Sequence, residues 1–187
     1  MATDFIIDME TLGQEDRSVI LSIGLFPIPE EEDYTLEELL ARGVYFKIER
    51  ESQIKLGRIA EQDTINWWKA QGEAAREVLS SKDCWPFEIV HRHLMGALKQ
   101  FGYDSKYSRI WSRGMIDQRW LQSLCKMYKL EEIPFWLWRD IRTILEFLTG
   151  SPYGTIKDSD PRFIKHNALH DCVLDYLRLK EAFANAQ

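Results

Sequence analysis

The sequence contains little cysteine. Its three cysteines, Cys84, Cys125 and Cys172, are an odd number and include no CxxC pair. The spacing therefore predicts neither a disulfide framework nor a zinc knuckle. We expect all three thiols to be reduced, as they are in a cytoplasm.

A long apolar run is also missing. No stretch approaches the roughly 18 to 20 apolar residues that a membrane helix needs, and the segment MATDFIIDME is acidic where a signal peptide would be basic. We therefore expect a soluble, non-exported protein that binds no membrane. The length of 187 residues, with 45% hydrophobic and 12% aromatic residues, suits one domain over 1–187 with a sizeable core.

An excess of positive charge is absent as well. The net charge of -6 argues against a protein that coats nucleic acid non-specifically, because that mode relies on many contacts between cations and phosphates. The charge is uneven, however. Residues 1–98 hold 10 Lys and Arg against 19 Asp and Glu, whereas residues 99–165 hold 12 against 8. An anionic ligand is expected to meet the second half of the chain.

The apolar pattern predicts strands first and helices later. Strands are expected over 4–10, 19–28 and 44–48, and from residue 60 the period becomes mainly helical, with a short strand over 108–114. Strands followed by helices, and then strands alternating with helices, predict a single α/β or α+β domain around a mixed sheet.

Several polar residues are predicted to begin helices. Thr35, with Glu38 in capping-box spacing, is expected to start a short helix that ends at Gly43. Asp63 and Asp140 are expected to cap two later helices.

Two acids end the first predicted strand, in the segment FIIDMETLG. Residues i and i+2 of a strand share a face about 6.6 Å apart, so Asp8 and Glu10 project together while Met9 faces the other side. Carboxylates this close repel one another, and either one is protonated or both hold a cation. Taken alone, the pair also fits a solvated strand end.

Further acids and histidines follow in the second half. HNALHDCVLD places His166 five residues before Asp171, and His170 five residues before Asp175, and spacing alone does not choose between the two sets. Asp117 follows a short strand, where it could cap a helix or join the first acids. Oxygen ligands without cysteine suit Mg²⁺ or Mn²⁺. Two such ions form a clamp for in-line displacement at phosphorus.

These segments together resemble a known family, the DEDDh 3'-5' exonucleases, which have the α/β ribonuclease H-like fold with a mixed central sheet flanked by helices. The resemblance is greatest to the branch that includes a mycobacterial adenylate-specific exoribonuclease and the exonuclease A of T-even phages. It covers nearly the whole chain, through FIIDMETLG, SVILSIG, ESQIKLGRIAEQDTINWWKAQ, IWSRGMIDQRWL, WRDIRTIL and HNALHDC.

The resemblance implies roles for individual residues. Asp8 and Glu10 match the first motif and Asp117 the second, while His166 and Asp171 match the third. Ala168 fits that third motif. The other set has no alanine at the matching position, so the resemblance places His170 and Asp175 on the helix surface or behind the ligands. Ile116 departs from the aromatic residue that relatives often carry before the second-motif acid.

By the same resemblance, two Mg²⁺ or Mn²⁺ ions are held by Asp8, Glu10, Asp117 and Asp171, and His166 accepts a proton from the attacking water. The substrate is the 3' end of single-stranded RNA or DNA, which the residues do not distinguish, and the product is a 5'-mononucleotide. The setting is the cytoplasm of a bacterial or phage-infected cell, and a homodimer is one possible assembly.

Substrate contacts are expected at six residues. The backbone of Met9, Thr11 and Leu12 would form a floor beneath the terminal nucleotide, as the resemblance implies. Trp67 and Trp68 are about 100° apart on a helix, so one packs in the core while the other borders a cleft and can stack on a base; core packing of both is the alternative. Arg113 is the candidate for phosphate binding, with Arg142 as a second.

Two other functions remain open at this stage. One is a catalytically silent relative that binds nucleic acid or a protein partner, although such a relative usually lacks a ligand or the base, and here all five positions are filled. The other is a hydrolase that uses paired acids without metal, as glycosidases do. Sensitivity to EDTA would exclude the second.

Overall fold

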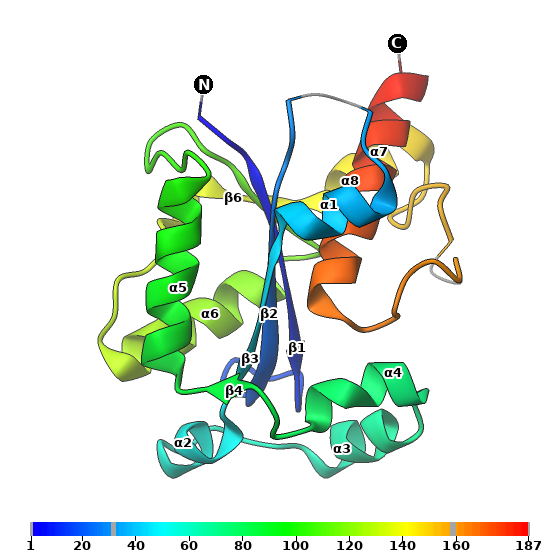
Figure 1. Cartoon of the computed structure of the whole chain (residues 1–187). Coiled ribbons are helices and arrows are strands. Elements are labelled where there is room, and N and C mark those ends of the chain that lie inside the picture. Colours follow the sequence, from blue (N-terminus) through cyan, green and yellow to red (C-terminus); the bar gives the residue numbers. More distant parts are fainter. Residues whose placement is uncertain (1, 31–32, 158–159, 187) are drawn as a thin grey trace.

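The computed structural model describes residues 2–30, 33–157 and 160–186. Its centre is a six-stranded mixed sheet with the order β4-β3-β2-β1-β5-β6 (Figure 1). The first three strands in sequence pair antiparallel, and the remaining neighbours pair parallel. The strands are β1 (Phe5–Thr11), β2 (Ile20–Pro27), β3 (Val44–Ile48), β4 (Cys84–Trp85), β5 (Ile110–Ser112) and β6 (Trp138–Asp140).

Helices cover both faces of the sheet, as predicted for an α/β fold (Figure 1). α5 (Phe87–Gln100) and α6 (Ile116–Tyr128) pack on one face, and α7 (Ile141–Thr149) and α8 (Ala168–Asn185) on the other. Shorter helices follow the first strands: α1 (Leu36–Arg42), α2 (Arg50–Lys55), α3 (Gln62–Lys69) and α4 (Glu73–Arg76), with 3₁₀ turns at Glu77–Leu79 and Phe135–Leu137. Within the described residues, no helix has the length and apolar character that a bilayer crossing requires.

Successive side chains of β1 point to opposite faces of the sheet. Phe5, Ile7 and Met9 belong to the core beneath α5 and α6, whereas Ile6 belongs to the core beneath α8. Because side chains alternate along a strand, Asp8 and Glu10 share the α8 face with Ile6. The prediction that Met9 points away from the two acids is confirmed.

Glycine allows α8 to approach the sheet closely. Gly24 of β2 lies opposite Asp8 in the strand register, and a Cβ at this position would collide with the backbone carbonyl group of Ala168. Ala168, the first residue of α8, is fully buried. The start of α8 therefore rests directly on the sheet beside the acids of β1.

Most of the predicted helix ends are confirmed. Thr35 forms a capping box with Glu38, the helix stops at Gly43, and the Asp140 side chain accepts the Arg142 N–H at the start of α7. The prediction for Asp63 is wrong, because Glu61 is the N-cap of α3 and Asp63 lies in its first turn. An acid in the first turn still favours the helix through its dipole.

Candidate active site

The acids that the sequence separates by more than a hundred residues meet at the end of β1. Asp8, Glu10, Asp117, His166 and Asp171 all line one cleft of about 270 Å³. Cations and aromatic rings also line this cleft, and they include Arg113, Arg142, Tyr153, Phe163, Lys165 and Arg178. Anionic and cationic groups therefore share one concave site.

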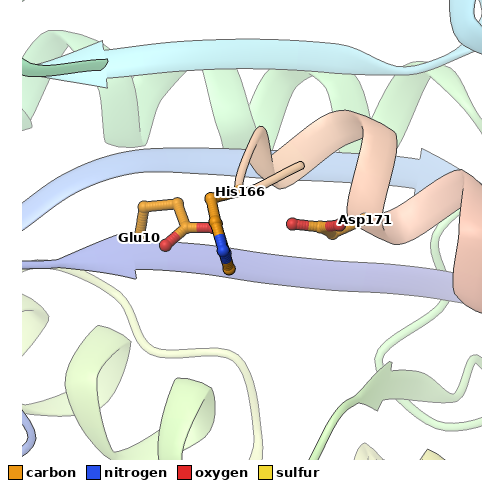
Figure 2. A group of neighbouring side chains, drawn as sticks. All are labelled: Glu10, His166 and Asp171. Carbon is orange, nitrogen blue, oxygen red and sulfur yellow. The ribbon is translucent and has the colours of Figure 1, made fainter. Parts of the chain in front are cut away.

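Within that cleft, Glu10, His166 and Asp171 form the tightest group. One ligand atom from each lies within 4.8 Å of the others, and the three side chains converge from β1 and the start of α8 (Figure 2). A divalent ion could be held by atoms at this separation. Asp8 and Asp117 line the same cleft outside this tightest group.

The start of α8 has a local cause. The Asn167 side chain accepts hydrogen bonds from the N–H groups of Leu169 and His170. The backbone carbonyl oxygen of Asn167 accepts a hydrogen bond from the Asp171 N–H. His166, just before this cap, has a left-handed backbone with φ of 60°. That turn brings the histidine back over the first helical turn, toward Glu10 and Asp171.

Asp117 is held by the main chain of β1. The Met9 N–H donates to Asp117 Oδ1 at 3.1 Å, and the Asp117 side chain is 3% exposed. The alternative role as a helix cap is wrong, because Met115 occupies the N-cap of α6 and makes no side-chain cap bond. Burial raises the pKa of Asp117 to about 8, against the effect of the Met9 hydrogen bond.

Burial and mutual repulsion act on the β1 acids as well. Burial raises the pKa of Asp8 well above its usual value, and Asp117, Glu10 and Asp171 add to the shift. The pKa of Glu10 rises for the same reasons, with Asp171 and Asp117 as its charged neighbours. A cluster of crowded carboxylates, which are hard oxygen donors, fits a divalent cation such as Mg²⁺ or Mn²⁺.

The tryptophan pair divides between the core and the edge of the cleft, so the alternative of core packing for both rings is wrong. Trp68 is 1% exposed, and its indole N–H donates to the Thr11 carbonyl oxygen at 2.9 Å. Trp67 is 43% exposed, and its ring lies edge-on to the His166 ring with 4.8 Å between centroids. Trp67 therefore borders the site, while Trp68 packs in the core and fixes the end of β1.

A second hollow adjoins the cleft beyond Glu10. Met9, Glu10, Thr11, Glu61 and Asp63 line it together with Trp67, Trp68 and Trp120. We call it the terminal hollow. Its residues include three acids and no lysine or arginine.

The predicted floor is only partly available to a ligand. Leu12 does not line the terminal hollow, and its N–H and carbonyl groups bond Val19 and Glu61. The Met9 N–H is taken by Asp117, and the Thr11 oxygen accepts the Trp68 indole. Contact of Met9, Thr11 and Leu12 with a nucleotide stays a prediction.

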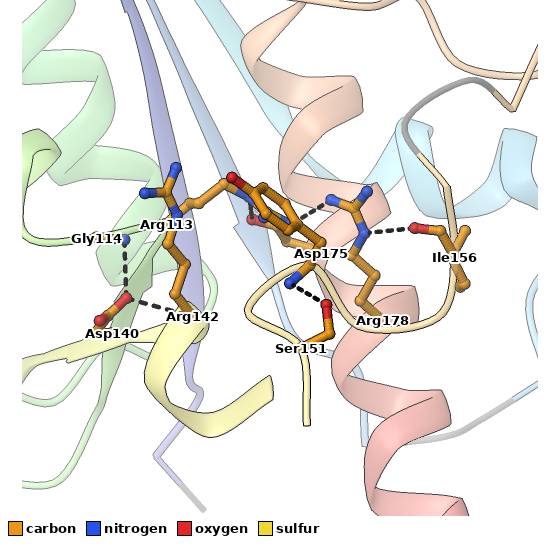
Figure 3. A network of polar contacts seen from close by, with 9 residues as sticks. Arg113, Gly114, Asp140, Arg142, Ser151, Ile156, Asp175 and Arg178 are labelled. Carbon is orange, nitrogen blue, oxygen red and sulfur yellow. Dashed lines mark hydrogen bonds and ion pairs between the residues drawn. The ribbon is translucent and has the colours of Figure 1, made fainter. Parts of the chain in front are cut away.

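Arg113 forms part of a buried ion-pair network (Figure 3). Its Nε donates to Asp175 Oδ2 at 3.1 Å, and its Nη2 pairs with the other oxygen. Arg178 Nη1 also donates to Asp175, at 3.0 Å, while its Nε bonds the Ile156 carbonyl oxygen. Asp175 thus links the loop before α6 to α8, and Arg178 links α8 to the segment that leads to His166.

The structure excludes one of the two places that the sequence leaves open for Asp175. It is 3% exposed and lines the cleft with Asp8 and Asp171, so the helix-surface alternative is wrong. His170 is half-buried, and its Nδ1 accepts the Ile164 N–H. Burial lowers the pKa of His170.

The residues predicted from the sequence include neither the cations Lys165 and Arg178 nor the aromatic rings Tyr153 and Phe163 that line the cleft. The excess of cations over 99–165 includes Lys165, whereas Arg178 lies beyond that range. Arg178 had no sequence pattern beyond its spacing of one turn from Asp175.

Comparisons with known proteins identify the family of this chain. The family described as "3'-5' exoribonuclease Rv2179c-like domain" matches residues 3–179. The exodeoxyribonuclease of Enterobacteria phage T4 is 31% identical over 211 residues, which cover 98% of this chain and 90% of the phage protein.

A solved structure, that of cell-death related nuclease 4 (CRN-4), matches 98% of this chain with a TM-score of 0.54 and 12% identity. This chain spans 64% of that nuclease's length. At this identity the likeness shows the fold alone, which is the α/β ribonuclease H-like fold.

Proposed function

Because the chain belongs to the 3'-5' exoribonuclease Rv2179c-like domain family, we propose that it is a metal-dependent 3'-5' exonuclease that releases 5'-mononucleotides from single-stranded nucleic acid. Family membership and the phage relative support a nuclease. The observation that carries the finer proposal is the convergence of four acids and one histidine in a single cleft.

Asp8, Glu10, Asp117 and Asp171 would hold divalent ions, because their charges are crowded and partly buried. Such ions, when bound, supply Lewis-acid stabilisation of charge on the attacked phosphate and on the departing 3' oxygen. The ions would also relieve the repulsion that raises the pKa of these carboxyl groups.

His166 is the proposed general base. Its ring lies with Glu10 and Asp171, where it can accept a proton from the attacking water. The edge of Trp67 packs against that ring and limits its movement. General-base catalysis of this kind contributes about 100- to 10,000-fold to a rate.

The charge on the two sides of the cluster supports a 3' to 5' direction. A 3'-terminal nucleoside has no phosphate beyond its sugar, which suits the terminal hollow with its acids and indole rings. The phosphates on its 5' side need cations, which line the cleft at Arg113, Arg142 and Lys165. A strand placed the other way would push phosphates against Glu61 and Asp63.

The test uses 5'-labelled single-stranded RNA and DNA of matched sequence with Mn²⁺. A ladder that shortens from the 3' end, together with 5'-mononucleotide products, is expected on at least one of them. Both sugars are needed because the family description names an exoribonuclease and the phage relative an exodeoxyribonuclease. Internal cleavage, or release of 3'-mononucleotides, would contradict the proposal.

A further inference from the structure

A second basic and aromatic surface lies away from the cleft, at the opposite end of the sheet's parallel strands. A hollow of about 490 Å³ is lined by Lys106, Tyr107, Arg109, Trp136 and Arg139. We call the surface that these five residues form the edge patch. It joins the segment between α5 and β5 to the edge strand β6, near the N-terminal end of β1 (Figure 1).

The aromatic rings of the edge patch are unusually open to solvent. Tyr107 is 66% exposed and Trp136 is 56% exposed. The neighbouring Phe135 ring stands edge-on to Trp136 with 5.3 Å between centroids, which restricts the indole without covering it. Exposed rings held in place form a stacking platform for bases.

The cations of the edge patch outnumber its acids. The hollow is lined by three cations, Lys106, Arg109 and Arg139, and by one acid, Asp4. Asp4 pairs with the Arg109 Nε at 2.7 Å. The nearby Asp104 carboxylate accepts the backbone N–H groups of Lys106 and Tyr107. A local positive excess in a chain of net charge -6 favours an anionic ligand.

Arg139 connects the edge patch to the catalytic cleft. It lies on β6, the edge strand, and one of its Nη atoms bonds the carbonyl oxygens of Trp136 and Trp138, so the arginine is anchored. Three residues later, Arg142 lines the cleft. The two arginines therefore flank Asp140, where β6 ends and α7 begins.

We propose that the edge patch binds the 5' portion of a single-stranded nucleic acid whose 3' end occupies the cleft. This inference rests on the proposed function. Phosphates would contact Lys106 and Arg139, and bases would stack on Trp136 and Tyr107. Alternating cations and open rings suit this ligand better than a protein surface, which would need a wider apolar area. Long substrates would then bind more tightly than short ones.

The test measures binding and turnover separately. Fluorescent single-stranded oligonucleotides of about 12 and about 3 nucleotides are titrated with the protein in EDTA, and release from the short one is followed in Mn²⁺. Trp136→Ala is expected to weaken binding of the long oligonucleotide about 5- to 140-fold. Arg139→Ala and Lys106→Ala should each reduce the salt slope of log Kd by about 0.7.

Two matched controls lie elsewhere on the surface. Trp85, 53% exposed on the other edge strand β4, and Arg92, exposed on α5, should change neither measurement when replaced by alanine. All variants should release nucleotides from the short oligonucleotide at the wild-type rate. Circular dichroism and thermal unfolding of each variant would establish that it is folded.

Unchanged affinity of folded Trp136→Ala and Arg139→Ala for the long oligonucleotide would overturn the inference. So would unchanged affinity combined with a loss of dimer in sedimentation, which would make the patch an interface between two copies. Failure of the proposed function has a different result: the wild-type protein would release no nucleotide from either length in Mn²⁺.

Discussion

The backbone N–H of Met9 donates a hydrogen bond to the carboxylate of Asp117, which lies 108 residues further along the chain. Met9 sits between the two acids of β1, so the strand uses its side chains at Asp8 and Glu10 and its main chain at Met9 to build one site. This bond fixes the start of α6 against the strand and keeps a buried acid close to two others.

The pH dependence of stability follows from this crowding. The pKa of Asp117 is raised to about 8, and those of Asp8 and Glu10 are raised as well. Acids with a higher pKa in the folded state bind more protons there, so the free energy of unfolding falls as pH rises from about 4 to about 8.

Urea denaturation in EDTA would measure this slope. We expect the free energy of unfolding to be lower at about pH 8 than at about pH 5.5 by at least about 1 kcal/mol, the value of one pKa unit. Asp117→Asn should flatten the slope, because it removes one of the titrating groups. A stability that rises over this range would show that the acids are not forced together.

Gly24→Ala tests the close approach of α8. The added methyl group would collide with the backbone at Ala168 and push the first turn of α8 away from β1. We expect a loss of about 1 to 3 kcal/mol in unfolding free energy and a fall in nucleotide release. Gly96→Ala is the control, since its Cβ would meet open space within α5 and should stabilise by up to about 1 kcal/mol.

Asp175→Asn tests the ion-pair network beside the cleft. It would leave Arg113 and Arg178 without their shared buried counter-charge, which we expect to cost about 3 to 5 kcal/mol of unfolding free energy. Asp160→Asn removes an acid from a pair with the exposed Arg162 and should have a much smaller effect. Equal effects in the two variants would contradict a structural role for the network.

The histidines before and within the first turn of α8, His166 and His170, should behave differently. His166→Ala is expected to lower the rate of nucleotide release by about 100- to 10,000-fold, because it removes the proposed proton acceptor. His170→Ala should have a much smaller effect, since that ring accepts the Ile164 N–H. Binding of Mn²⁺, measured by titration calorimetry, should persist in both. A reversal of the two rates would show that the motif has been assigned to the wrong set.

The sequence predicts much of the fold well because strand alternation and helix caps are local patterns. Strand alternation alone places Asp8 and Glu10 on one face and Met9 on the other, and this holds in the structure. The capping box at Thr35 is likewise a local hydrogen-bond pattern. Asp63 failed as a cap because Glu61, two residues earlier, already begins the helix.

What the sequence does not predict depends on contacts between distant segments. The bond from Met9 to Asp117 uses a backbone N–H, which every residue except proline possesses. The pairing of Asp175 with Arg113 requires α8 and the loop before α6 to be adjacent, which only the folded sheet brings about. The edge patch likewise joins three segments that no short motif links.

The most direct test of the central claim is nucleotide release from 5'-labelled oligonucleotides in Mn²⁺ by the wild-type protein and by Asp171→Asn, with excess EDTA as a control. The account predicts stepwise shortening from the 3' end by the wild-type protein, its loss in EDTA, and no detectable release by the folded variant. Wild-type turnover by Asp171→Asn, or turnover that survives EDTA, would contradict a metal-dependent exonuclease at this cluster.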